Sequence, residues 1–138
     1  MKLMRMGLAL AVCWLGLSAS TARADVVIDF DTYAAVAFST ETGKYGYAWN
    51  YGSRAAAERA ALAKCKADDA KIVGWVKGGW LVLVVGDNNA YGVAWEYGDG
   101  ARSSVAKRRA LDELKKRKGK AVALICLCSG DYDPEVVR

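Results

Sequence analysis

Aromatic side chains recur at every second position in two short stretches of the chain. Residues 45–51 read YGYAWNY and residues 91–97 read YGVAWEY. Alternate positions of a β-strand share one face, so we expect rings on one face and small residues on the other. Such rings could bind sugars or a protein partner, since Tyr and Trp give a large contact area at low entropic cost; they could equally pack in the core or against a second copy of the chain. The binding candidates are Tyr47, Trp49, Tyr51, Trp95 and Tyr97.

One carboxylate lies within these strands. Glu96 falls on the small-residue face, at the position that Asn50 has in the first stretch. A carboxylate that is partly desolvated there could serve as a general acid, and Asp99 or Glu58 could supply the second carboxylate of a hydrolase. Carboxylates near strand ends are commonly solvated, however. Glu96 is therefore a weak catalytic candidate.

Other catalytic groups have little support. The chain has no histidine, which excludes the usual Ser-His and Cys-His activation of a nucleophile. Cys126 and Cys128 lie in an apolar stretch, where burial makes a thiol unreactive. These two cysteines with Cys65 are a poor zinc ligand set, and the acidic stretches at 87–89 and 131–133 offer too few ligands for calcium. We predict no cofactor and no metal, and we favour a protein without enzymatic activity.

Residues 107–120 form a run of charge that we expect on a helix. Opposite charges four residues apart, such as Arg109 and Glu113, favour a solvated face crossed by ion pairs. Lys115 and Lys118 have no acidic residue to compensate them in this pattern. The alternative is therefore docking through these lysines to an anionic surface such as phospholipid head groups, a cell-wall polymer or an acidic protein.

The first 24 residues have the pattern of a signal peptide. Lys2 and Arg5 precede an apolar stretch over 6–17, and the letters ARA at Ala22–Ala24 predict cleavage after Ala24. A membrane anchor would need about 20 apolar residues, and lipidation at Cys13 would need a small residue before it. We expect an exported protein, periplasmic or extracellular, without a transmembrane segment.

The mature chain would run from 25 to 138 as a single domain, a length that suits one core. It would carry 17 basic and 15 acidic residues, a net charge of +2, which does not indicate a nucleic-acid partner. Its three cysteines allow one disulfide and one free thiol. Cys126 and Cys128 point the same way along a strand, which is poor geometry for bridging each other, so the favoured pairing joins Cys65 to either of them.

The aromatic stretches belong to a unit written twice, over about 33–76 and 80–128, with a tail at 129–138. Each unit reads as an apolar strand, the aromatic strand, a helix over 53–66 or 103–118, and another apolar strand. Small residues let another backbone approach closely, so we expect the helices on that face of the strands. The prediction is an α+β fold with pseudo-two-fold symmetry. The strands would form either one antiparallel or mixed sheet with both helices on one face, or a pair of packed sheets.

A hairpin with the letters TGKYGYAW precedes an alanine-rich helix of the form S-R-x-x-A-x-x-x-A-L-x-x-C. This pattern resembles the family called domain of unknown function 4189, small exported proteins found mostly in bacteria, and the similarity spans roughly residues 33–129. Its markers in this chain are Ser39, Thr42, Gly43, Gly46, Ser53 and Cys65.

The resemblance implies a secreted, disulfide-stabilised α+β module with no assigned enzymatic activity or cofactor. Relatives usually carry further cysteines where this chain has residues 67–71, Trp80 and Leu114, so the chain is a cysteine-depleted member. We predict an exported binding module whose partner is a protein, with an inhibitor or immunity role conceivable. The alternative is a small cell-wall or polysaccharide-directed hydrolase using Glu96, or a carbohydrate-binding module. Self-association is a third interpretation.

Overall fold

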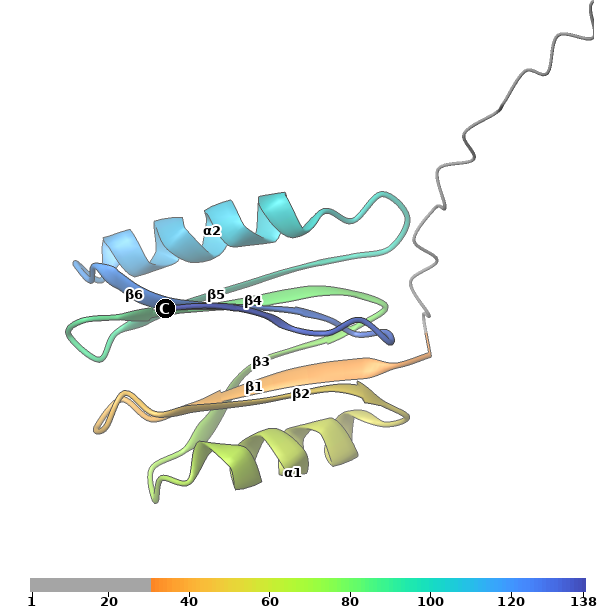
Figure 1. Ribbon diagram of the computed structural model, residues 1–138, viewed down its shortest axis with the longest axis horizontal. Coiled ribbons are helices and arrows are strands. Elements are labelled where there is room, and N and C mark those ends of the chain that lie inside the picture. Colours follow the sequence, from red (N-terminus) through yellow and green to blue (C-terminus); the bar gives the residue numbers. More distant parts are fainter. Residues whose placement is uncertain (1–30) are drawn as a thin grey trace, which may run out of the picture.

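The computed structural model describes residues 31–138. These residues form four stacked layers (Figure 1). A helix forms each outer layer, and two β-sheets lie face to face between the helices. The signal peptide predicted over residues 1–24 lies outside the described residues. Within residues 31–138, no helix has the length and apolar character needed to cross a membrane.

The first half of the described chain builds one sheet and its helix. The elements are β1 (Tyr33–Phe38), β2 (Tyr45–Tyr51), α1 (Arg54–Cys65) and β3 (Lys71–Lys77). The strands are antiparallel in the order β2-β1-β3, which leaves β2 and β3 at the edges. Ser53 caps α1, because its hydroxyl accepts a hydrogen bond from the Ala56 amide at 3.2 Å.

The second half repeats this order and adds one strand. The elements are β4 (Gly79–Gly86), β5 (Tyr91–Tyr97), α2 (Ser103–Lys116), β6 (Ala121–Cys128) and β7 (Glu135–Val137). They form a second antiparallel sheet in the order β5-β4-β6-β7. The α+β class is confirmed. The pseudo-two-fold relation stays a prediction, supported by the shared order of elements.

The prediction of a single sheet with both helices on one face is wrong. The strands form the alternative, a pair of packed sheets. The reason is that β1 and β4 are apolar on both faces. Val36 and Leu83 lie between the sheets, whereas Ala37 and Val84 lie under the helices, and all four are fully buried. In a single sheet with helices on one side, the other apolar face would contact water. A second sheet therefore covers it.

Each helix lies on the small-residue face of its sheet, as the sequence predicts. A Cβ atom added to Gly46 would collide with the backbone of α1 at Ala61, and one added to Gly92 would collide with the backbone of α2 at Ala110. Both glycines lie in the aromatic strands, Gly46 between Tyr45 and Tyr47 and Gly92 between Tyr91 and Val93. The glycines therefore allow the helices to approach so closely that the rings must point to the opposite side.

The three cysteines among residues 31–138, Cys65, Cys126 and Cys128, are buried and free. Cys65 packs with alanines between α1 and the first sheet, whereas Cys126 packs with Val82 and Val84 between α2 and the second sheet. Two sheets separate these positions, so the expected bridge from Cys65 to Cys126 or Cys128 does not form. The disulfide stabilisation that the family resemblance implies is replaced by apolar packing.

The buried side chain of Ser39 holds the first hairpin in place through hydrogen bonds, and it explains the spacing of the family markers Ser39 and Thr42. Ser39 is fully buried; its hydroxyl donates to Asp69 and accepts hydrogen bonds from the Thr42 amide at 3.1 Å and the Thr42 hydroxyl at 2.8 Å. Asp69 also accepts from the Glu41 amide at 3.1 Å. The family markers Ser39 and Thr42 therefore have a structural role, because they join the β1–β2 turn to the loop after α1.

Candidate functional site

The aromatic candidates do not form one platform. The strand β2 is an edge of the first sheet and lies across from β6, whereas β5 is an edge of the second sheet and lies across from β3. The two ring-bearing strands are thus at opposite sides of the sandwich. Tyr47 and Trp49 lie at one side, and Trp95 and Tyr97 at the other.

Tyr51 lies on the opposite face from Tyr47 and Trp49, which corrects the prediction for this residue. The pairing of β1 with β2 shifts between Tyr33 and Ala35, and Asn50 has a left-handed backbone with φ of 60°. This bulge turns the next side chain to the other face. Tyr51 consequently packs with the alanines under α1.

Three exposed rings gather where β3 meets β5, and we call this surface the tryptophan groove. Trp75, Trp95 and Tyr97 are 37%, 45% and 70% exposed. They line a groove of about 800 Å³, together with Val73 and Gly74 of β3. Gly74 lies against Val93 and Leu81 of the second sheet, so the two edges approach closely at the base of the groove.

Charged side chains of α1 and β3 border this groove. The guanidinium of Arg54 lies 4.1 Å from the ring of Trp75, an arrangement that favours a cation–π interaction. Its Nε atom lies 2.7 Å from Oε1 of Glu58, so the positive charge of Arg54 is paired. Lys77 completes the border. The groove therefore combines exposed aromatic side chains with a border of mixed charge.

A second groove, which we call the β2 groove, follows the free edge of β2. It has a volume of about 860 Å³ and contains the predicted residues Tyr47 and Trp49, together with Tyr45 and Lys64. The three rings pack partly against the core between the sheets. The sequence therefore predicted part of each groove but combined residues of the two.

Glu96 has a structural partner. Its side chain is 21% exposed, and its carboxylate forms an ion pair with Arg109 of α2. This pair joins α2 to β5 and gives the carboxylate a structural partner. The Arg109–Glu113 pair expected along the helix is replaced, since Glu113 pairs with Lys116 at 2.7 Å.

The remaining predicted contacts lie away from both grooves. Lys115 and Lys118 are exposed at the C-terminal end of α2 and in the turn that follows it, and they line neither groove. Within the described chain, no group of three or more cysteines or carboxylates is arranged to hold a metal ion.

Sequence reasoning missed Trp75, Arg54 and Lys64. Residues 71–77 read KIVGWVK, which is typical of a buried strand, and only the position of β3 at a sheet edge exposes Trp75. Arg54 and Lys64 appeared as ordinary polar residues of a helix. Their relevance depends on which rings lie beside the helix, and that depends on pairing between distant strands.

Comparison with known proteins assigns this chain to a family. A search of the curated proteins and a search of the solved structures found no match. A family model described as "Domain of unknown function (DUF4189)" matches residues 33–128, from the first residue of β1 to the last residue of β6. The matched region contains both sheets except β7, both helices and the rings of both grooves. The chain therefore belongs to the DUF4189 family, as the hairpin and the alanine-rich helix predicted.

Proposed function

We propose that the chain is an exported, non-enzymatic binding module whose partner is another protein, bound at the tryptophan groove. The observation that carries the proposal is that Trp75, Trp95 and Tyr97, on two adjoining edge strands, are exposed and line the same groove. Export rests on the sequence pattern of residues 1–24.

The composition of the groove favours a protein partner. Trp, Tyr and Arg are the residues enriched at the centres of protein–protein interfaces, where they supply most of the binding free energy. Here two tryptophans and a tyrosine lie beside Arg54, whose guanidinium already covers one ring. A partner that inserts apolar side chains between the rings would remove a large aromatic area from water.

The exposure of these rings also favours binding over a packing role. Rings of the core between the sheets, such as Phe38, are almost fully buried. By contrast, Tyr97 is 70% exposed and Trp95 is 45% exposed. Contiguous exposed apolar side chains on a soluble domain mark interaction sites.

The test removes the two most exposed rings together. The double variant Trp95→Ala, Tyr97→Ala should keep its fold, because neither residue belongs to the buried core and Tyr97 is largely exposed. Wild-type protein would be used to capture partners from a cell-envelope extract, which mass spectrometry would identify. The purified partner would then be titrated against both proteins by calorimetry, and we expect at least a tenfold weaker Kd for the double variant.

Tyr132→Ala is the matched control, because Tyr132 is also an exposed ring, at 40%, and does not line the groove. This variant should bind as the wild type does. A partner that binds the double variant with wild-type affinity would contradict the proposed site. An extract that yields no specific partner would contradict the proposed function itself.

A further inference from the structure

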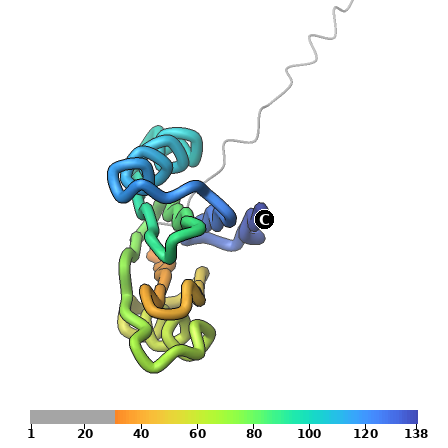
Figure 2. The backbone as a smooth tube through the Cα atoms, turned by 90° about the vertical axis from the view of Figure 1, so that its left-hand side faces the viewer, coloured from red at the N-terminus to blue at the C-terminus, as the bar shows by residue number. Residues whose placement is uncertain are grey.

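The β2 groove is open because the second sheet extends past the first. The strand β2 ends its own sheet, whereas the strand opposite it, β6, is followed outward by β7. Figure 2 shows the C-terminal strand projecting to the side of the layers formed by the first half of the chain. Val136 of β7 packs against the core between the sheets. The rings of β2 therefore face a ledge formed by the second sheet, with open space along their outer side.

Three rings form a row in this groove. The centroids of Tyr45 and Tyr47 are 6.4 Å apart, and those of Tyr47 and Trp49 are 6.1 Å apart. The planes of the first two rings differ by 19°. The row follows from the period of two along β2, and it ends at the bulge that sends Tyr51 to the other face. It offers an aromatic surface about three residues long.

The charges around the row are positive. The side chains of Lys44, Lys64, Lys66 and Arg138 line the groove, and no aspartate or glutamate side chain of the described residues does so. In the tryptophan groove, by contrast, Glu58 pairs with Arg54. A concave surface lined by charges of one sign concentrates ligands of the opposite sign. The β2 groove is therefore complementary to an anion.

Lys64 has a particular position. It belongs to α1, on the outer face of the first sheet, yet its Nζ atom lies 5.8 Å from the ring centre of Tyr47 and 5.3 Å from that of Trp49. Those rings point to the inner face, so the side chain passes around the free edge of β2. A lysine in this position hinders the addition of another strand to the edge. It also holds an ammonium group beside the rings.

We propose that the β2 groove binds an acidic polysaccharide, a polymer of sugar rings that carry carboxylates. The aromatic row would contact the apolar faces of the sugar rings, and the lysines would form charge-assisted hydrogen bonds with the carboxylates. An extended acidic peptide fits less well, because it would use the strand edge that Lys64 crosses. The volume lies within the range of ligand sites, roughly 300–1,000 Å³.

This site is separate from the tryptophan groove, which lies at the other side of the sandwich. The inference does not rest on the proposed protein partner. A chain with both sites could hold a protein at one side and an acidic polymer at the other. The two sites can also be tested independently, because no residue lines both of them.

The test is a calorimetric titration of the purified protein with oligomers of polygalacturonate and of alginate, both of which carry a carboxylate on each sugar. We expect Lys64→Gln to weaken binding about fivefold, the effect of losing one partly exposed ion pair. Lys64→Arg should retain most of the affinity. Lys115→Gln, which removes the same charge from α2 in the opposite outer layer, should leave the Kd unchanged, as should the Trp95→Ala, Tyr97→Ala variant. Added salt should weaken binding of the wild type.

Two comparison ligands test whether the groove requires both sugar rings and carboxylates. Dextran, a neutral polysaccharide, should not bind measurably, and poly-glutamate should bind much more weakly than polygalacturonate. Equal or tighter binding of poly-glutamate would overturn the proposal in favour of an acidic protein segment. The proposal is also overturned if neither acidic polysaccharide binds, or if Lys64→Gln and Lys115→Gln have equal effects.

Discussion

At the scale of single residues, two glycines determine how closely each helix lies on its sheet. Gly46 and Gly92 occupy equivalent positions of YGYAW and YGVAW. In each case, an added methyl group would meet a helix carbonyl and a helix amide rather than a flexible side chain. The backbone there cannot move away without shifting the whole helix. The conformation of these glycines is ordinary, so their role is steric.

We predict that Gly46→Ala and Gly92→Ala each lower the free energy of unfolding by about 2–3 kcal/mol, the cost of overpacking a tight contact. Urea unfolding followed by circular dichroism measures the change. Gly52→Ala is the matched control, since a Cβ there has no atom within 4 Å, and it should change stability by less than about 0.5 kcal/mol. Equal effects at all three positions would be incompatible with the close helix contact.

A second residue-scale feature links the hairpin to pH. The Ser39 hydroxyl and, more weakly, the Glu41 amide donate hydrogen bonds to Asp69, and they lower the pKa of its carboxyl below the ordinary 3.8. A group with a lowered pKa in the folded state binds its proton more readily when unfolded. It therefore stabilises the fold above its unfolded pKa, and this contribution is lost as the pH falls through the folded pKa.

Asp69→Asn should therefore be less stable than the wild type near neutral pH, and the difference should shrink as the pH falls below the ordinary carboxyl pKa of 3.8. The midpoint of urea unfolding, measured across this range, tests the prediction. Ser39→Ala removes the main cause of the lowered pKa, so in that background the Asp69→Asn effect should depend little on pH. A wild-type advantage that stays constant down to pH 2 would exclude this explanation.

At the scale of elements, the strand patterns of the sequence predict most positions but not their irregularities. The period of two places Tyr47 and Trp49 on the face away from the helix, as observed. It fails at Tyr51, because Asn50 adopts a left-handed conformation that asparagine tolerates and a regular strand lacks. No local sequence pattern predicts this bulge, because it depends on the pairing of β2 with β1.

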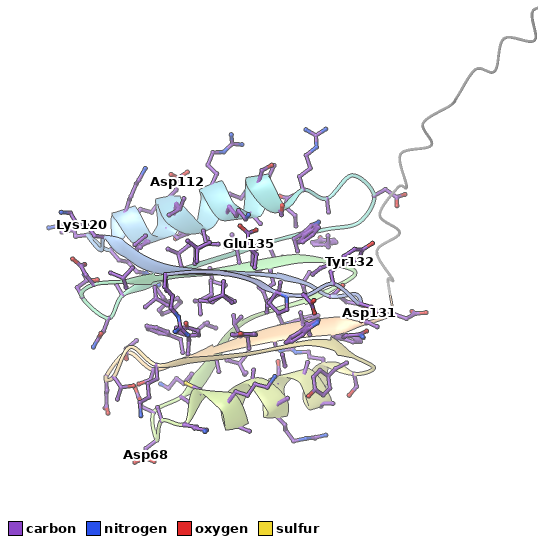
Figure 3. All side chains as sticks on the ribbon, in the orientation of Figure 1. Asp68, Asp112, Lys120, Asp131, Tyr132 and Glu135 are labelled. Carbon is purple, nitrogen blue, oxygen red and sulfur yellow. The ribbon has the colours of Figure 1, made fainter. Side chains whose placement is uncertain are left out.

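The thiol of Cys126 in β6 is shielded from solvent by the elements around it. Cys126 lies under α2, and burial raises the pKa of its thiol to about 11, opposed in part by the nearby ammonium of Lys107. Lys107 is held by Glu135 of β7 at 2.6 Å, and Figure 3 shows Glu135 on the α2 side of the sheet. The helix and the last strand thus enclose this position.

We predict that Cys126 does not react with iodoacetamide in the folded protein at about pH 8, because almost none of its thiol is ionised or accessible. It should react fully once urea unfolds the chain, as peptide mass spectrometry would show. An Ala121→Cys variant provides the control, since Ala121 is exposed at the start of the same strand. If Cys126 reacted in the folded protein as fast as that introduced thiol, burial under α2 would be wrong.

At the scale of the whole molecule, the two sheets are offset so that each side exposes one ring-bearing edge strand. The β5 side has a groove with a mixed-charge border, and the β2 side has a groove lined by lysines. This separation turns two similar sequence stretches into two chemically different surfaces. The function that we propose depends on the separation, because each surface would bind its own ligand.

The sequence was sufficient for the class of fold, the order of elements from β1 to β6 and the face on which each helix lies, because all three follow from local patterns of ring, small and apolar residues. It did not predict β7, which lies in the segment described as a tail. It was insufficient for the number of sheets and for the sites. Trp75 and Trp95 line one groove only because β3 ends the first sheet across from β5. The sequence around each residue does not indicate which distant strand will lie beside it.

The most direct test of the layered arrangement is a set of proton–proton nuclear Overhauser effects measured in solution. The structure predicts contacts from the Gly46 α-protons to Ala61 and Cys65 of α1, and from the Gly92 α-protons to Ala110 and Leu114 of α2. It also predicts contacts between the rings of Phe38 and Tyr91, whose centres are 5.0 Å apart across the two sheets. Contacts from the rings of Tyr45 or Tyr91 to the inner faces of the helices, in place of those from the glycines, would contradict the account.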